Sequence, residues 1–356
     1  MPYSLSIALA ACAASLLLTP LVTRFARGIG ALDHPGPRRV HREPVPTLGG
    51  LALIATVLGA AWLARALPGP ARALDPRPLL GLTLAAIPVA ALGVFDDLRG
   101  VPPLVKIGVQ ICAALVLSLF GYGVTEITNP LGGTLAAHAL GLPLTVIWVL
   151  IVMNAINLID GLDGLAAGVV ALAAATLWWV GREHGDFYVM FVSAILLGST
   201  LGFLRMNFPP ARVFMGDTGS QFLGLTLAAV SLLENRKGTT AVTLLLPIVA
   251  LGLPILDSTM AFARRLIAGR PVFHGDSEHI HHRLLRLGLP MRSAVALLWG
   301  LCAMLSAAAV LLEPLPRRTA GWLAMLLALV VLVVFEGIQY QVAKRERSNG
   351  GAAIPD

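Results

Sequence analysis

Eleven apolar runs constrain this chain more than any other feature of its sequence. A membrane-spanning helix needs roughly 20 predominantly apolar residues. The chain has 356 residues and only 13% are charged, whereas soluble domains carry about 25%. The runs cover residues 3–23, 48–67, 79–95, 104–120, 140–158, 164–181, 187–204, 218–233, 240–258, 293–312 and 320–340. We therefore predict an all-α, polytopic transmembrane protein of about eleven helices.

Lysine and arginine residues predict how these helices are oriented. If the loop after each odd-numbered run faces the cytoplasm, that side holds 18 of the 26 basic residues. Cytoplasmic loops of membrane proteins carry such an excess. We expect an outside N-terminus, a cytoplasmic C-terminus, one membrane domain over residues 1–342 and a disordered polar tail over residues 343–356. The net charge of +7 then fits contact with a lipid bilayer and no nucleic acid.

Aspartates gather on the same predicted side, and the first motif there is an adjacent pair. Asp96 and Asp97 end the third run, in Phe95-Asp-Asp-Leu-Arg99. Two neighbouring carboxylates repel, and a divalent metal or a cationic substrate relieves that repulsion. Lys106, at the start of the next run, suits a phosphate as a point charge. The alternative is a solvated pair that merely ends a helix.

A second motif places four polar residues at three-residue intervals within apolar sequence. These residues are Asn154, Asn157, Asp160 and Asp163. At a helix end, side chains three positions apart share a face. Polar groups in a membrane segment are costly unless they serve a site. We favour a site over the alternative of a polar helix terminus.

A third motif, Phe214-Met-Gly-Asp-Thr-Gly-Ser220, precedes the eighth run. Asp217 stands there at a predicted helix N-terminus, where backbone N–H groups are available to a phosphate. Thr218 or Ser220 as an ordinary helix cap is the alternative.

Two loops carry further basic groups on the predicted cytoplasmic side. His274, His279, His281 and His282 lie within nine positions, beside Arg283. We favour a phosphate site there over zinc or a solvated loop, because no cysteine lies nearby. The earlier loop from Asp33 to Gly50 includes Arg42 and is typical of a positive-inside loop.

As a set, these motifs resemble the polyprenyl-phosphate N-acetylhexosamine-1-phosphate transferases of glycosyltransferase family 4. The resemblance implies that a UDP-N-acetylhexosamine and a polyprenyl phosphate, such as undecaprenyl phosphate, give a polyprenyl-diphospho-sugar and UMP. It also implies dependence on Mg²⁺, or on Mn²⁺, in a bacterial cytoplasmic membrane. The site would face the cytoplasm.

The resemblance assigns roles to the motif residues. Asp217 is the expected metal ligand together with Asp160. The expected catalytic residues are Asp96, as the base at the lipid phosphate, and Asp97, Asp160 and Asp163. The expected substrate-binding residues are Arg42, Lys106, Asn154, Asn157, His279, His281, His282 and Arg283.

The subfamily follows from the histidine motif. His279-Ile-His-His-Arg283 resembles the GlcNAc-1-phosphate branch, because the phospho-MurNAc-pentapeptide branch usually has three consecutive histidines and an aromatic residue. That second branch stays an alternative. Outside enzymes, a proton-coupled transporter is the rival, but its carboxylates would lie within the helices and not at one face. Direct in-line transfer and a two-step route through an aspartate remain open, and a homodimer is allowed without a feature that decides it.

Overall fold

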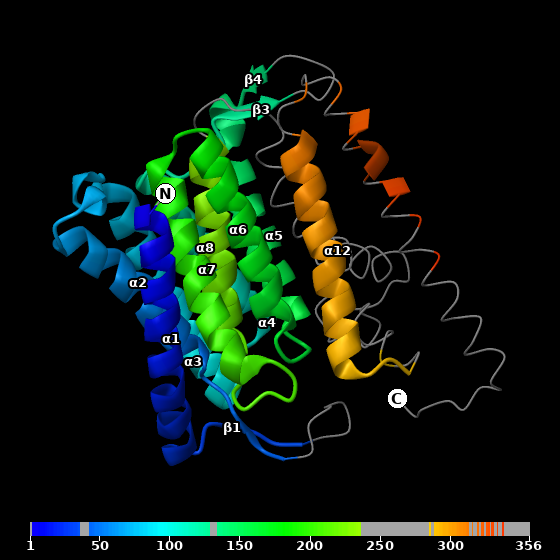
Figure 1. Ribbon diagram of the computed structural model, residues 1–356. Helices are drawn as coiled ribbons and strands as arrows, with labels where there is room; N and C mark the ends of the chain where they lie inside the picture. The colour runs from blue at the N-terminus through cyan, green and yellow to red at the C-terminus, as the bar shows by residue number, and fades with distance from the viewer. Residues whose placement is uncertain are drawn as a thin grey trace.

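The computed structural model describes residues 2–35, 43–128, 134–235 and 288–312, with Leu285 and separate positions between 315 and 337. Nine α-helices have their bounds in the described residues, and they stand side by side as a bundle (Figure 1). They are α1 (Pro2–Gly28), α2 (Gly50–Ala66), α3 (Pro76–Arg99), α4 (Pro103–Leu119), α5 (Gly141–Ile159), α6 (Leu165–Glu183), α7 (Phe187–Asn207), α8 (Gly216–Asn235) and α12 (Met291–Leu312).

Nine of the predicted apolar runs coincide with these helices, within a few residues at each end. The run at 240–258 lies outside the described residues, and the run at 320–340 does so in part, so the count of eleven stays a prediction. Six of the described helices are long and apolar enough to cross a membrane, which makes this a multi-pass membrane protein. Helices α2 and α4 are shorter apolar helices.

Two short antiparallel strand pairs add to the predicted all-α architecture. Strands β1 (Leu32–Asp33) and β2 (Val45–Pro46) pair at one end of the bundle, and β3 (Glu126–Thr128) and β4 (Thr134–Ala136) pair at the other. Both pairs lie in connections between helices, where pairing satisfies backbone groups that no helix satisfies. Strands of two or three residues are too short for an alternating pattern to reveal.

Helix α8 lies at the centre of the bundle and contacts α2, α3, α5, α6 and α7. It is buried around its whole circumference, since residues 218–232 are all buried, and Phe222, Leu223 and Leu227 are fully buried. A helix that is hydrophobic on all sides is a buried helix. Its first turn is thereby held among the ends of the surrounding helices.

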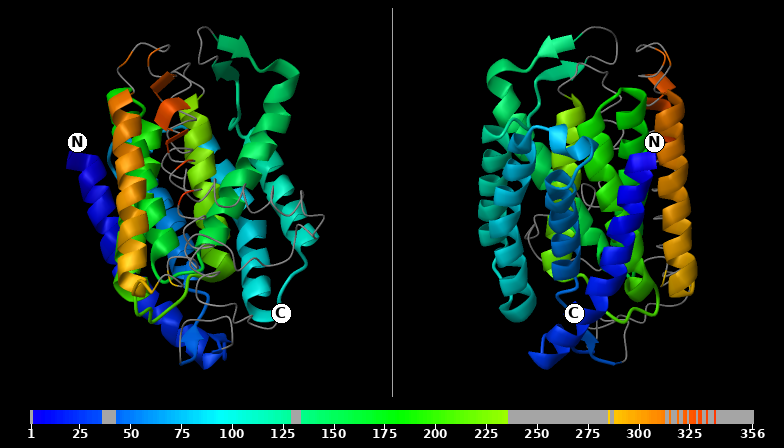
Figure 2. Two further views of the ribbon diagram at one scale, coloured as in Figure 1. Left: turned by 90° about the vertical axis from the view of Figure 1, so that its right-hand side faces the viewer. Right: turned by 60° about the vertical axis from the view of Figure 1, so that its left-hand side comes forward.

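One end of the bundle, here called the site end, gathers the termini that carry the sequence motifs. There α1, α3, α5 and α7 end, and α2, α4, α6, α8 and α12 begin (Figure 2). The described basic residues divide between the two ends as the topology predicts. The site end holds Arg24, Arg27, Arg99, Lys106, Arg205, Arg212 and Arg292, and the opposite end holds Arg65, Arg72, Arg77 and Arg182.

Candidate active site

Two carboxylates and one ammonium group meet at the site end, although they lie far apart in the sequence. The Nζ atom of Lys106 lies 2.6 Å from Oδ2 of Asp217 and also forms an ion pair with Oδ2 of Asp96. All three side chains are partly buried. We call Asp96, Asp97, Asp160 and Asp217, with Lys106, the acid cluster.

The turn between α3 and α4 positions two members of the cluster. Gly100 ends α3 with a φ of 74°, a conformation that glycine adopts without strain. The chain reverses there, and the backbone N–H of Val101 donates to Oδ1 of Asp96 at 2.6 Å. Lys106 follows in the second turn of α4, so its ammonium group reaches back to Asp96.

Asp97 caps the N-terminus of α8 from the neighbouring helix α3. Its Oδ1 accepts from the backbone N–H of Asp217 at 2.7 Å, and its Oδ2 accepts from the backbone N–H and hydroxyl of Thr218 at 3.2 and 2.6 Å. Gly216 has a φ of 68°, and a Cβ atom there would strike the Asp97 carboxylate. The expectation of a phosphate at these N–H groups was therefore wrong, because Asp97 already occupies them.

The four residues of the second motif lie in three places: Asn157 and Asp160 lie at the acid cluster, Asn154 lies deeper in the bundle, and Asp163 lies at a pocket described below. Asn157 donates from Nδ2 to Oγ of Ser220 at 2.9 Å, beside the acid cluster. Asn154 lies one turn further from the site end and donates to Oε1 of Gln110 and to the Leu150 carbonyl, both at 2.8 Å. The three-residue spacing therefore does not bring all four side chains to one ligand.

Asp160 ends α5 and lies within the electrostatic reach of the other carboxylates. Burial raises the pKa of Asp160 well above its ordinary value of 3.8, and neighbouring negative charges raise it further. These neighbours are Asp217, Asp97 and Asp163. A bound cation would remove the repulsion that now favours the neutral form of Asp160.

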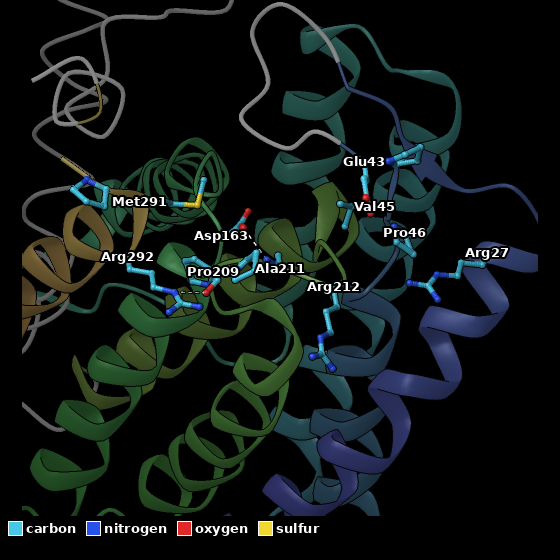
Figure 3. Close-up of a pocket in the computed structure, with 13 residues that line it drawn as sticks. Arg27, Glu43, Val45, Pro46, Asp163, Pro209, Ala211, Arg212, Met291 and Arg292 are labelled. Atoms are coloured by element: carbon cyan, nitrogen blue, oxygen red, sulfur yellow. Dashed lines mark hydrogen bonds between the residues drawn. The ribbon is translucent and has the colours of Figure 1, made fainter. Parts of the chain in front are cut away.

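Asp163 turns to a pocket that opens beside the cluster. The pocket has a volume of about 660 Å³ and is lined by Asp163, by the end of α1, by residues 43–46 and 209–212, and by residues 290–292 at the beginning of α12 (Figure 3). Oδ2 of Asp163 accepts from the backbone N–H of Ala211 at 2.8 Å, which ties the α5–α6 turn to the α7–α8 loop. The pocket volume lies in the range of small-molecule sites.

Three arginines from separate elements surround this pocket, and we call it the arginine pocket. They are Arg27 from the last turn of α1, Arg212 from the α7–α8 loop and Arg292 from the first turn of α12 (Figure 3). Nε of Arg292 donates to the Pro209 carbonyl at 2.9 Å, and its guanidinium has further N–H donors. Two carboxylates, Asp163 and Glu43, also line the pocket, so the lining keeps an excess of positive charge that suits an anion.

Sequence reasoning missed Arg212 and Arg292 as functional residues. It counted both as basic residues of positive-inside loops. Arg212 lies two positions after the Pro209-Pro210 pair, and such prolines indicate an ordered loop. That signal could have separated Arg212 from the other basic residues, whereas Arg292 offered none.

The acid cluster fits a Mg²⁺ ion by its chemistry. Mg²⁺ prefers oxygen ligands, and it commonly binds through one or two carboxylates together with substrate phosphates and water. Among the described residues no three histidine, cysteine or carboxylate side chains converge as a preformed metal cage. Asp217 and Asp160 would hold the ion, because Mg²⁺ commonly needs only one or two protein carboxylates. Burial is the largest cause of the raised pKa of Asp160, and the negative charges of Asp217, Asp97 and Asp163 add to it.

The histidine motif and Arg42 lie outside the residues that the structure describes. This applies to Arg42, His279, His281, His282 and Arg283, which stay predictions.

Comparison with known proteins places these motifs in a larger group. The model of the family described as glycosyl transferase family 4 matches residues 79–235. A probable undecaprenyl-phosphate N-acetylglucosaminyl 1-phosphate transferase of Bacillus subtilis is 35% identical over 90% of this chain and 87% of its own length. A decaprenyl-phosphate N-acetylglucosaminephosphotransferase of Mycobacterium tuberculosis is 35% identical over 88% of this chain and 85% of its own. An undecaprenyl-phosphate alpha-N-acetylglucosaminyl 1-phosphate transferase of Escherichia coli is 28% identical, with 90% and 87% covered.

Proposed function

This chain belongs to glycosyl transferase family 4, and we propose that it transfers N-acetylglucosamine 1-phosphate from UDP-N-acetylglucosamine to a polyprenyl phosphate. One structural observation carries the proposal. Residues from α3, α4 and α8 converge in the acid cluster, and a pocket of about 660 Å³ lined by three arginines lies at the same end of the bundle. The relatives named for this reaction resemble the chain over most of its length.

The reaction exchanges one phosphorus–oxygen bond for another. An oxygen of the polyprenyl phosphate attacks the phosphorus that carries the sugar. The bond between the two donor phosphates breaks, and UMP leaves with that bond's electron pair. Such transfers depend on positioning and charge neutralisation more than on covalent catalysis. We therefore favour direct in-line attack over a route through a phosphorylated aspartate.

Asp96 and Lys106 serve the acceptor in this proposal. Asp96 accepts the remaining proton of the lipid phosphate, since its Oδ2 atom lies at the partly buried junction with Lys106. The Lys106 ammonium group lies between two carboxylates and supplies positive charge where acceptor and donor phosphates meet. Asp97 acts as a positioning residue, because its oxygens hold the backbone that presents Asp217.

Asp217 and Asp160 would hold Mg²⁺, while Asn157 keeps the α5 end against α8 through Ser220. When bound, the ion neutralises the donor diphosphate and stabilises the departing UMP.

The arginine pocket receives the donor. UDP-N-acetylglucosamine is a dianion that carries a nucleoside at one end and a sugar at the other, and the pocket offers three guanidinium groups together with the Asp163 and Glu43 carboxylates. Arginine matches phosphate oxygens with a planar fork of donors. The site end faces the cytoplasm of a bacterial cell in this proposal, because the basic residues concentrate there. The acceptor would be undecaprenyl phosphate or a related polyprenyl phosphate.

The proposed reaction is tested by UMP release from the purified protein in detergent. We expect release with UDP-N-acetylglucosamine that requires undecaprenyl phosphate and Mg²⁺, and that Asp217→Asn abolishes. UMP release with UDP-N-acetylgalactosamine and with UDP-MurNAc-pentapeptide, measured in parallel, shows which sugar the protein transfers. No release with any donor would contradict the proposed function.

The metal site is tested by the melting temperature, a readout that does not depend on turnover. A ligand that binds the folded state raises stability by about 2.7 kcal/mol at one hundred times its dissociation constant. We expect Mg²⁺ to raise the Tm of the unmodified protein and of Asp163→Asn, and to do so less for Asp160→Asn. If Mg²⁺ raised the Tm of both variants equally, Asp160 would not be a metal ligand.

A further inference from the structure

A layer of three amide side chains lies beneath the acid cluster, one helical turn further from the site end. Nε2 of Gln110 donates to Oε1 of Gln221 at 2.8 Å, and Nδ2 of Asn154 donates to Oε1 of Gln110 at 2.8 Å. Gln110 and Gln221 are fully buried. The three residues come from α4, α8 and α5, and we call them the amide layer.

Each member of the amide layer stands one turn behind a residue of the proposed site on the same helix. Gln110 follows Lys106 by four positions on α4, and Gln221 follows Asp217 by four on α8. Asn154 precedes Asn157 by three positions on α5. Side chains three or four positions apart lie on one face of a helix. The layer therefore joins the same three helices that meet in the site.

We infer that the amide layer is a positioning device that fixes the register of α4, α5 and α8, so that Lys106 meets Asp217 and Asn157 meets Ser220. A slide of α4 along α8 would separate the Lys106–Asp217 pair, which now spans 2.6 Å, and would break the Gln110–Gln221 hydrogen bond at the same time. Asn154 then acts through this layer and not by binding substrate. The sequence had suggested substrate binding for it.

Helix packing alone does not account for the layer. Helices α5 and α8 are already joined by a buried hydrogen bond from Nε1 of Trp148 to Oγ of Ser231 at 2.9 Å, near the other end of α8. Moreover, Nε2 of Gln221 is buried and finds no hydrogen-bond partner among the described residues. An unsatisfied buried donor destabilises a fold, and a methionine of similar shape would avoid that cost. The amide at Gln221 contributes an acceptor for Gln110, which methionine cannot provide.

The test distinguishes a loss of helix register from a loss of stability by replacing Gln110 and Gln221 together. Replacing both members of a buried hydrogen bond with apolar groups of similar shape is nearly neutral for stability. We expect Gln110→Met with Gln221→Met to keep a Tm close to that of the unmodified protein, because Asn154, which loses its bond to Gln110, is only half-buried and still donates to the Leu150 carbonyl. Its kcat should nevertheless fall at least tenfold, because displacements of about 1 Å in an active site cost up to about a hundredfold. The KM for UDP-N-acetylglucosamine should stay within about twofold, since the arginine pocket is lined by neither α4 nor α8.

A second readout does not depend on the proposed function. The acylation rate of Lys106 by a small amine-reactive ester, followed by peptide mass spectrometry, reports how tightly its ammonium group is held. We expect severalfold faster acylation in Gln221→Met and in the double variant. Ser231→Ala is the matched control, because it removes a buried hydrogen bond between α5 and α8 far from the cluster. It should lower the Tm and leave Lys106 acylation and kcat unchanged.

Three outcomes would overturn the inference. They are a double variant with unchanged kcat, Lys106 acylation that does not respond to either substitution, and a Ser231→Ala variant that matches the amide variants. The kcat measurement rests on the proposed function. If the unmodified protein transfers no sugar phosphate, that function fails, and the acylation rates by themselves confirm or refute the register device.

Discussion

The acid cluster and the arginine pocket share one end of the bundle, but different structures hold their charges in place. In the cluster, Asp96, Lys106 and Asp217 come from the ends of packed helices and are joined by ion pairs. In the pocket, Arg27 and Arg212 are exposed and lie on a helix end and a loop. Helix packing and ion pairs hold the side chains of the cluster in place, whereas most of the pocket lining belongs to connections between helices.

This difference suits the two tasks in the proposed reaction. Groups that take part in chemistry must be held within a fraction of an ångström, and helices do this better than loops. Ligand recognition commonly resides on loops that a rigid scaffold positions. Arg292 is held more firmly than the other two arginines of the pocket, since it lies in the first turn of α12 and donates to the Pro209 carbonyl. Substitutions in the cluster should therefore lower kcat, and substitutions in the pocket should raise KM.

The largest effect is expected from Lys106→Met. The substitution removes the cation between Asp96 and Asp217 and leaves two carboxylates to repel each other. We expect kcat to fall by about 10²–10³-fold, the usual cost of deleting one preorganised group that stabilises charge. Arg99→Met is the control, because it removes an exposed neighbouring cation that packs on Phe95. An equal loss in the control would show that only the general positive potential matters.

Asp97→Asn should have the next largest effect, through the start of α8. An asparagine keeps the shape but cannot accept on both sides as the carboxylate does from Asp217 and Thr218. Loss of a helix cap costs about 0.5–2 kcal/mol, and we expect a fall in kcat of about tenfold together with a lower Tm.

Asp186 provides a matched control for this prediction. It caps α7 at the opposite end of the bundle and accepts from the backbone N–H groups of Tyr188 and Val189 at 2.9 and 3.0 Å. Both N–H groups donate to Oδ1 of Asp186, so Asp186→Ala, which removes the cap, should lower the Tm to a similar extent and leave kcat unchanged. If both variants lose activity in proportion to their lower Tm, Asp97 only stabilises the fold and does not position Asp217.

The helices and the cluster were largely predictable from the sequence, for a physical reason. A bilayer imposes a length and an apolar composition on each spanning helix, so hydropathy locates it. Asp96, Lys106 and Asp217 stood out because charge at the end of an apolar run is costly. Their convergence followed from the predicted topology, in which odd-numbered helices end, and even-numbered helices begin, on the same side of the membrane.

The remaining contacts depended on three-dimensional geometry that no sequence period reveals. That Asp97 caps α8 required the approach of α3 to Gly216, 119 positions away in the chain. The regular spacing of Asn154 and Asp163 indicated one shared face, but α5 ends at Ile159 and the following turn points Asp163 elsewhere. Gln110 and Gln221 carried no signal, because a single amide within an apolar run has no recognisable partner until the helices are packed.

In the arginine pocket, Arg292→Ala should raise the KM for UDP-N-acetylglucosamine by about tenfold and change kcat little, the pattern of lost ground-state binding. Its Nε atom donates to the Pro209 carbonyl, and the residue lines the pocket. Arg292→Lys keeps the charge but loses the planar fork, so it should recover only part of the affinity. Initial rates at varied donor concentration decide this. A fall in kcat at unchanged KM would instead place Arg292 with the chemistry of the cluster.

The smallest effect is expected from Arg27→Ala. Arg27 is exposed in the last turn of α1 and lines the arginine pocket, so its interaction with a phosphate is screened by salt. We expect the donor KM to rise about twofold at low ionic strength, and the difference to vanish near 1 M salt, where the Debye length is about 3 Å. Arg24→Ala is the control, because Arg24 is equally exposed one turn earlier and does not line the pocket. If both variants raise KM alike, α1 contributes only to the general potential of the site end, and the pocket's specific cations are those of the α7–α8 loop and α12.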